Sequence, residues 1–383
     1  MENIKYRILT FVRYLGDSFY YPFIALYLKS RGLVESKIGF IIGLSPLIGV
    51  LLNPLYTLIC KNFKRTKEVL GIISILEAIA ITFISFSTNF TSITICAIFI
   101  AIFGACHYGL MDSLVTIYAE VSNKPYSSIR VFGSIAYVIG TMGGGLLIKY
   151  ISYSWCFIIA NFLFIISGII YLLINPIDKE KEELNIKPIE VFKNKSYYLY
   201  LIVFVLFMTI CFSGDHFFSL FLKAKGFDES QFGFVYSYYV IIETIVMIVL
   251  TKFKDRLKGD VLILAAIVFM LIRQFVNFLD LNIVSIIILS GLRGISVGIF
   301  FHVAYTYFLK LLGLRLTTIG IMIANCGQQL GIFLMDNVNG QVIDNYGFKI
   351  FYLILVILCV VLLLIQIIRM VLFKRKKVER III

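Results

Sequence analysis

The stretch Leu28–Phe40, LKSRGLVESKIGF, recurs without gaps at Leu222–Phe234 as LKAKGFDESQFGF. The two copies lie 194 residues apart and share seven identities in thirteen positions. The same spacing also places Gly133 on Gly327. A parallel repeat of this length predicts that the chain consists of two similar halves, each with the same succession of elements.

The composition excludes a water-soluble protein. Of the 383 residues, 60% are hydrophobic and only 15% are charged, and the mean hydropathy is +0.95. A soluble domain carries about 25% charged residues. The apolar residues form continuous runs long enough to cross a bilayer as helices, whereas the strands of a transmembrane β-barrel would alternate. Soluble enzymes, secreted disulfide scaffolds and nucleic-acid-binding domains are therefore excluded. The predicted spans are 8–29, 38–60, 69–88, 91–119, 127–149, 153–174, 197–222, 232–251, 261–281, 283–309, 317–343 and 348–372.

These spans and the repeat together predict an all-α polytopic membrane protein. Its twelve transmembrane helices form two pseudo-symmetric six-helix bundles. We assign residues 1–175 to the N-terminal bundle and residues 197–383 to the C-terminal bundle, which ends in a basic cytoplasmic tail. Residues 176–196 form the longest hydrophilic stretch and are predicted to be a cytoplasmic linker.

The basic residues are distributed unequally between the two sides of the predicted membrane. Of 35 Lys and Arg, 24 fall on the side of the N-terminus, seven on the opposite side and four within spans. Because cytoplasmic loops carry the excess of positive charge, both termini are predicted to be cytoplasmic, in a plasma or inner membrane. The net charge of +13 thus reports topology and implies no nucleic-acid partner. The first span leads straight into a second, so we expect it to be retained rather than cleaved as a signal. The seven cysteines lie in or at the ends of spans, and their spacing indicates neither disulfides nor a metal site.

Charged side chains inside the spans mark the functional chemistry. Each costs roughly 2.5–3.5 kcal/mol at the bilayer centre, so seven cost about 20 kcal/mol before pairing. They must therefore pair with one another or line water. The seven are Asp17, Glu77, Asp112, Asp215, Glu243, Arg273 and Arg293, and all three histidines, His107, His216 and His302, also fall within spans.

Helical spacing groups some of these residues. Arg13 and Asp17 are four apart, so they either form an intrahelical ion pair or line a cavity. Arg293 and His302 are nine apart and so lie on opposite faces of one helix, and only one is expected to line the cavity. Asp215 and His216 point about 100° apart. A polar stripe on the fourth span, which we expect to line the cavity, comprises Tyr108, Asp112, Thr116 and Glu120.

The chain resembles the major facilitator superfamily, in the branch of proton-linked symporters that includes lactose, nucleoside and phenylpropionate permeases. The resemblance covers nearly the whole chain. It depends on the order and spacing of several short segments rather than on one motif. These are Tyr21-Pro22-Phe23 followed by Leu28-Lys29 and Gly32, Arg130-Val131-Phe132-Gly133-Ser134, Glu243 with Arg273, and Leu292-x-Gly294 through His302.

This resemblance implies roles for individual residues. Arg130 matches an Arg that contacts the sugar in the lactose permease, and Tyr137 matches an aromatic residue that stacks on the sugar ring. Glu243 and Arg273 match an acid and an Arg that take part in proton coupling, and Asp215 is expected to assist them. The remaining expected contacts to the solute are Asp17, Asp112 and His302.

We therefore predict a secondary active transporter that moves a small polar solute by alternating access, with proton symport as the favoured coupling. Sugars, nucleosides and organic acids all remain open as the solute. A proton-coupled exporter of drugs or other amphiphiles is the alternative, although the fifth span lacks the Gly-Pro element typical of drug antiporters. A membrane-embedded transferase is disfavoured, since it has no reason for a two-fold repeat. No nucleotide-binding loop is present, so we expect no cofactor, a proton gradient as the energy source, and function as a monomer.

Overall fold

The computed structural model describes residues 2–60, 62–124, 126–177, 191, 194–252, 258–279 and 281–379, and in these it is helical throughout its regular structure. Its elements are α1 (Glu2–Tyr20), η1 (Tyr21–Phe23), α2 (Ile24–Ser30), α3 (Glu35–Ile59), α4 (Phe63–Phe86), α5 (Phe90–Gly104), α6 (His107–Val121), α7 (Ser127–Tyr150), α8 (Tyr153–Leu173), α9 (Lys195–Ala224), α10 (Glu229–Lys252), α11 (Gly259–Phe278) and α12 (Ile283–Glu379).

Within the described residues, ten helical stretches are long and apolar enough to cross a bilayer. The last of them, Ile319–Leu372, has 54 residues, about twice what one crossing needs. Two glycines with left-handed backbone, Gly313 (φ 69°) and Gly347 (φ 76°), divide α12 into three helices. Helix α1, which carries several charged residues, is not one of these ten stretches. Adding it and dividing the last stretch at Gly347 gives the twelve predicted spans.

Two predicted spans are interrupted in the structure. The first changes from α1 to a 3₁₀ turn at Tyr21–Phe23 before α2 begins, at a point where Pro22 supplies no backbone N–H. The fourth divides into α5 and α6 around Ala105 and Cys106. Next to this break Gly104 packs closely on the Glu77 carboxyl group, where a Cβ would lie 2.6 Å from Oε1. Both interruptions therefore lie next to Glu77 and Tyr21, which share a hydrogen bond of 2.8 Å.

Local sequence signals fix several helix starts. The side chain of Asn62 accepts a hydrogen bond from the backbone N–H of Arg65 at the start of α4, and Asn89 does the same for Ser92 at the start of α5. Such caps satisfy one of the four backbone donors that the first turn of a helix leaves unpaired. Helices α4 and α5 consequently begin at residues that the sequence marks as caps.

The chain forms two compact units. The first contains residues 1–183, 216–237 and 336–340, and the second contains residues 184–215, 238–335 and 341–383. The predicted bundle boundaries remain a prediction. Of the predicted linker, residues 178–190 and 192–193 lie outside the described residues.

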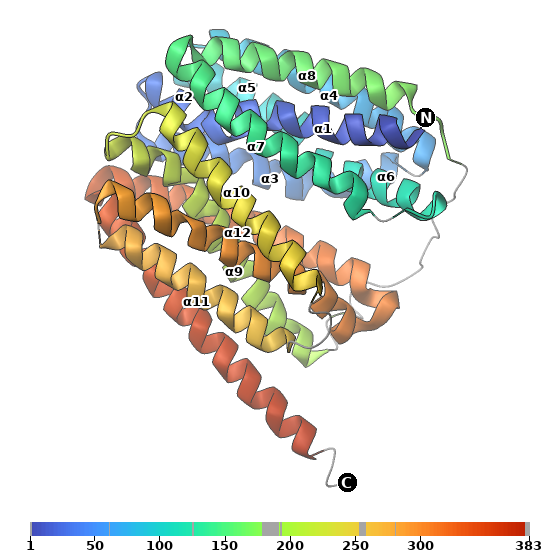
Figure 1. The fold of residues 1–383 in the computed structure, drawn as a ribbon, viewed down its shortest axis with the longest axis vertical. Helices are drawn as coiled ribbons and strands as arrows, with labels where there is room; N and C mark the ends of the chain where they lie inside the picture. Colours follow the sequence, from blue (N-terminus) through green and yellow to red (C-terminus); the bar gives the residue numbers. More distant parts are fainter. Residues whose placement is uncertain are drawn as a thin grey trace. The chain divides into compact units, whose positions relative to one another are not determined.

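In the first unit, α1 packs along both α7 and α8, and α4 packs along α8. Figure 1 shows α8, α1 and α7 side by side. Although α1 is the least apolar of the long helices, Arg13 and Asp17 on it are fully buried. Helix α1 thus carries Arg13 and Asp17 into the interior of the unit rather than toward lipid.

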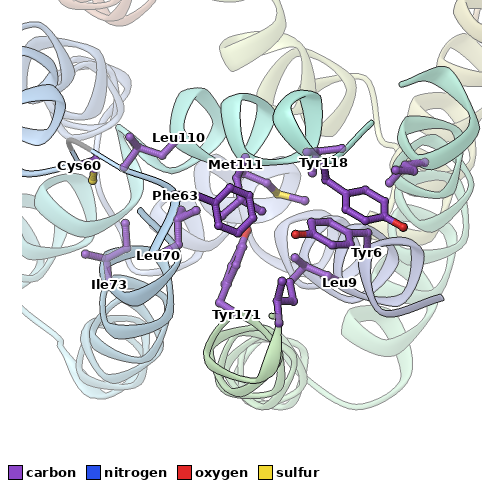
Figure 2. Packing of buried hydrophobic residues seen from close by; sticks show 14 of the residues in the cluster. Tyr6, Leu9, Cys60, Phe63, Leu70, Ile73, Leu110, Met111, Tyr118 and Tyr171 are labelled. Carbon is purple, nitrogen blue, oxygen red and sulfur yellow. The ribbon is translucent and has the colours of Figure 1, made fainter. Parts of the chain in front are cut away.

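Aromatic residues dominate the packing around α1. The rings of Tyr6 and Tyr118 stack with centroids 3.8 Å apart. Figure 2 shows this pair beside Leu9, with Phe63 and Met111 next to Tyr171. Because lipid is as apolar as these side chains, such contacts stabilise a membrane bundle through van der Waals packing rather than through the hydrophobic effect.

Candidate functional site

Four charged residues of the second unit form one ionic cluster, to which each of four helices contributes one member. Asp215 comes from α9, Glu243 from α10, Arg273 from α11 and Arg293 from α12. Arg273 Nη2 lies 2.7 Å from Asp215 Oδ1, and Arg293 Nε donates to Asp215 Oδ2 over 2.9 Å. Arg293 Nη1 also donates to Glu243 Oε2. Asp215 is therefore held between two guanidinium groups.

The formal charges of this cluster balance, because two carboxylates face two guanidinium groups. Both arginines are nearly inaccessible, with exposed fractions of 2% for Arg273 and 6% for Arg293. Pairs buried to this degree balance a large desolvation cost against their mutual attraction, so removing one partner is strongly destabilising. The cluster is stable only while its charges stay matched.

The structure brings together Glu243, Arg273 and Asp215, the three residues predicted for coupling, and adds Arg293 to them. Sequence reasoning recognised Arg293 as a charge inside a span but did not assign its partners. The ion pair of Glu243 is made with Arg293, and that of Arg273 with Asp215. His302, nine residues beyond Arg293, is half-buried and makes no hydrogen bond or ion pair within the described part of the chain.

A second ionic cluster lies in the first unit. Arg13 Nη2 lies 3.0 Å from Asp17 Oδ1, and Arg13 Nη1 donates to Glu77 Oε2 over 2.7 Å. The predicted i,i+4 pair is thus present on α1 and is joined by Glu77 of α4. Sequence spacing gave no signal for Glu77, because it is 64 residues from Arg13. All three side chains have an exposed fraction of 0%.

Three predicted solute contacts, Asp112, Arg130 and Tyr137, lie among tyrosines of the first unit. Tyr126 donates its hydroxyl to Asp112 Oδ1 over 2.8 Å. The guanidinium of Arg130 stands 4.3 Å from the ring centre of Tyr14, a cation–π distance. The ring of Tyr137 lies 5.9 Å from that of Tyr236. Asp112, Arg130 and Tyr137 are each only partly buried, unlike Asp17.

His216 points to a different environment from that of its neighbour Asp215, as the helical spacing predicted. Its Nδ1 lies 2.7 Å from Asp336 Oδ2 in the first unit. His216 also lines a cavity of about 150 Å³ together with Tyr20, Tyr21, Ser45 and Pro46. The sequence did not predict this pair, because Asp336 is 120 residues from His216.

We call the end of the first unit at which the loops 31–34, 151–152 and 225–228 lie the distal end. Helices cross each other closely at this end. Between α7 and α10, Thr141 and Ser237 hydroxyls lie 2.6 Å apart. A Cβ on Gly145 would lie 2.5 Å from the carbonyl oxygen of Glu229, and one on Gly233 would lie 2.4 Å from that of Thr141.

A second crossing joins α3 to residues 336–340 of α12. Here a Cβ on Gly39 would meet the Asp336 carbonyl oxygen at 2.3 Å, and one on Gly340 would meet that of Glu35 at 2.5 Å. Both crossings at the distal end therefore require residues without side chains, because backbone approaches backbone directly.

An ion pair joins α7 to the loop before α10, next to the crossing of these two helices. Lys149 Nζ lies 2.8 Å from Asp228 Oδ2 in the loop before α10. The hydrogen bond from Lys149 lowers the pKa of Asp228 below its ordinary value. A carboxylate with a lowered pKa contributes stability above its ordinary pKa, and this contribution is lost as the pH falls through the lowered value.

We expect acidification below the ordinary Asp range to weaken this pair, and Asp228→Asn to remove that part of the acid dependence. The effect is small because both side chains are more than 30% exposed. Thermal unfolding at neutral and acid pH measures it, with Lys149→Gln and the double variant completing a cycle. Strict additivity of the two single shifts would show that the pair does not interact.

The fold and its charges define a class of protein: a multi-pass helical membrane protein whose ionic groups lie inside the apolar spans. A family model described as "MFS_1 like family" matches residues 3–354. The chain belongs to this family of transporters, as the sequence resemblance predicted.

Curated relatives and solved structures agree with this assignment. The chain is 24% identical over 351 residues to the "uncharacterized transporter YwbF" of Bacillus subtilis (strain 168), covering 91% of this chain and 88% of the relative. It is 23% identical over 397 residues to the sucrose permease of Escherichia coli, covering 94% and 93%.

Two solved structures have the same fold. The nucleoside transporter NupG superposes with a TM-score of 0.83 at 16% identity, covering 96% of this chain and 99% of its own. A bacterial homologue of the human lysosomal transporter Spinster, solved in an inward-facing and unoccupied conformation, gives 0.70 at 12% identity, covering 96% of each chain. These relatives are membrane transporters, not enzymes.

Proposed function

We propose that this transporter imports a small polar solute by proton symport, and that Asp215, Glu243 and Arg273 couple the two fluxes together with Arg293. The observation that carries the proposal is the matched ionic cluster of the second unit. Two arginines bind two acids there, so each carboxylate can accept a proton only when its arginine withdraws. A movement of Arg293 away from Glu243 would leave a carboxylate in a low dielectric, where a proton binds strongly.

The solute class follows from the polar groups of the first unit. Asp112, Arg130 and Tyr137 supply an acceptor, a fixed cation and a ring, which suit a hydroxylated or anionic ring compound. Asp17 and His302 are the further contacts we propose. A sucrose permease and a nucleoside transporter are among the proteins to which the chain is similar, which supports sugars and nucleosides beside organic acids as solutes.

The proposed setting is a plasma or inner membrane with both termini in the cytoplasm. The excess of Lys and Arg on the side of the N-terminus supports this orientation. The distal end would then face outward. We propose that the transporter works as a monomer and uses the proton gradient without a cofactor.

Proton flux into proteoliposomes tests the proposal. External alkalinisation is expected on adding one compound from a panel of sugars, nucleosides and organic acids. Glu243→Gln is expected to abolish this flux, because amides do not bind the proton. Glu68→Gln on α4 is the matched control, since that acid lies outside both ionic clusters, and it should leave the flux unchanged. Solute movement outward against protons would instead establish an exporter.

A further inference from the structure

The ionic cluster of the first unit has unmatched charge. Asp17 and Glu77 both bind the guanidinium of Arg13, and all three side chains are fully buried. Ionised, the two acids and one arginine carry a net charge of −1. The cluster of the second unit differs, since its two acids face two arginines.

Groups on the neighbouring helices do not supply the missing positive charge. Asp112 on α6 and Arg130 on α7 carry one charge of each sign and so add no net charge, and their printed contacts are with Tyr126 and Tyr14 rather than with this cluster. His107 on α6 is fully buried, and its Nε2 shares a hydrogen bond of 3.0 Å with the Tyr171 hydroxyl rather than with either acid. The remaining titratable neighbours are phenols, which are neutral near pH 7. They include Tyr14, Tyr20, Tyr21, Tyr56, Tyr108 and Tyr171.

An uncompensated charge in this dry site would cost several kcal/mol, and one bound proton removes it. The hydrogen bonds indicate which acid holds that proton. Glu77 accepts at both oxygens, from Arg13 at Oε2 over 2.7 Å and from Tyr21 at Oε1 over 2.8 Å, as a carboxylate does. Asp17 is held less tightly: its Oδ2 accepts a longer hydrogen bond of 3.3 Å from Arg13 Nε, and its Oδ1 lies 3.0 Å from Arg13 Nη2 without an aligned hydrogen bond. The Tyr108 phenol also lies beside this carboxyl group.

We propose that the Asp17–Glu77 pair is a proton-binding site of this transporter, occupied in this conformation by a single proton on Asp17. The inference deepens the proposed function and rests on it for the role of the proton in coupling. The presence of the proton follows from the charges alone.

A route to this site is present in the first unit. Tyr21, whose hydroxyl donates to Glu77, also lines the cavity of about 150 Å³ that His216 lines. A cavity of this volume with phenol, hydroxyl and imidazole groups on its wall has room for several waters. A proton can pass from His216 through such waters and Tyr21 to Glu77, which is one of the two acids of the pair.

Infrared spectroscopy of the purified protein tests the resident proton without requiring a solute. We expect a carbonyl-stretch band of a protonated carboxylic acid at neutral pH, and we expect ¹³C-labelled aspartate to shift it. Asp17→Asn and Glu77→Gln should each remove the band, because either change leaves one acid opposite Arg13. The charges then balance without a bound proton. Glu68→Gln, on the same helix as Glu77, should retain it. No band sensitive to Asp17 and Glu77, or a band that labelled aspartate leaves unshifted, overturns the assignment.

The pH dependence of thermal stability gives a second readout, which does not depend on transport. The wild type should lose thermal stability as the pH rises and the proton leaves, because the uncompensated charge then appears. Asp17→Asn should lack this loss, since it mimics the protonated acid. An equal loss in Asp17→Asn and the wild type would contradict the proposal.

Transport assays distinguish two questions. One is whether the chain is a proton symporter, and the other is whether the proton on Asp17 is the coupled one. If the chain is a proton symporter, Asp17→Asn should reduce uphill accumulation at least roughly tenfold, as expected for loss of a buried charge switch. Solute counterflow, which needs no net proton movement, should persist in Glu77→Gln, because this variant also removes the resident proton and Glu77 is not among the proposed solute contacts. Absence of proton flux in the wild type would overturn symport but leave the infrared band. Uphill uptake by Asp17→Asn at the wild-type level would show that the resident proton is not the coupled one.

Discussion

Replacing Arg293 with alanine is expected to abolish solute accumulation and to lower the free energy of unfolding by about 3–5 kcal/mol. Arg293 donates to Asp215 over 2.9 Å and also binds Glu243, so its loss leaves two acids facing only Arg273. The variant would bury a net negative charge where the wild type is balanced. Thermal unfolding in detergent and uptake into proteoliposomes measure the two effects.

Variants that keep the charges matched distinguish the effect of ion pairing on stability from the effect of side-chain packing. Arg293→Gln with Glu243→Gln removes one charge of each sign, so this double variant should unfold at a higher temperature than Arg293→Gln alone. It should nevertheless fail to couple proton flux, because the acid of the pair is absent. If the double variant is no more stable than the single one, charge matching is not what stabilises the cluster.

The sequence predicted the fold nearly completely because the bilayer makes span length and apolar character decisive. The repeat at Leu28–Phe40 and Leu222–Phe234 predicted two halves, and the family match confirms the kind of protein. The interruptions at Tyr21–Phe23 and around Cys106 were not predicted. They lie where the backbone adapts to contacts with Glu77, and contacts between distant helices leave no local pattern.

Only part of the site could be predicted, because contacts between distant helices leave no local pattern in the sequence. The cost of burying charge identified Asp17, Asp215, Glu243 and Arg273 as residues that must find partners. Partners four residues apart, such as Arg13 and Asp17, could be predicted from helical periodicity. Partners on other helices could not, because the rotation of each helix about its axis is set by packing. The resemblance named Glu243 and Arg273 together for coupling, and the structure adds Arg293, which forms an ion pair with Glu243.

Introducing a bulky side chain at a distal-end crossing is expected to hold that end apart. A Cβ on Gly145 would already lie 2.5 Å from the Glu229 carbonyl oxygen, and backbone cannot move aside as a flexible side chain can. Gly145→Trp should therefore prevent α7 and α10 from closing. Overpacking costs about 1–3 kcal/mol, which corresponds to a roughly fivefold to hundredfold fall in the closed population.

Disulfide trapping measures this closure directly. Thr141 and Ser237, whose hydroxyls lie 2.6 Å apart, can be replaced by cysteines and oxidised. The cross-link should form in the parent, fail in Gly145→Trp and form again in Gly109→Trp, since a Cβ at Gly109 meets nothing within 4 Å. Alternating access requires the crossing to open and close, so Gly145→Trp should also lose transport while the control keeps it. Transport at the parent rate by a variant that cannot form the cross-link would show that the α7–α10 contact is not part of the cycle.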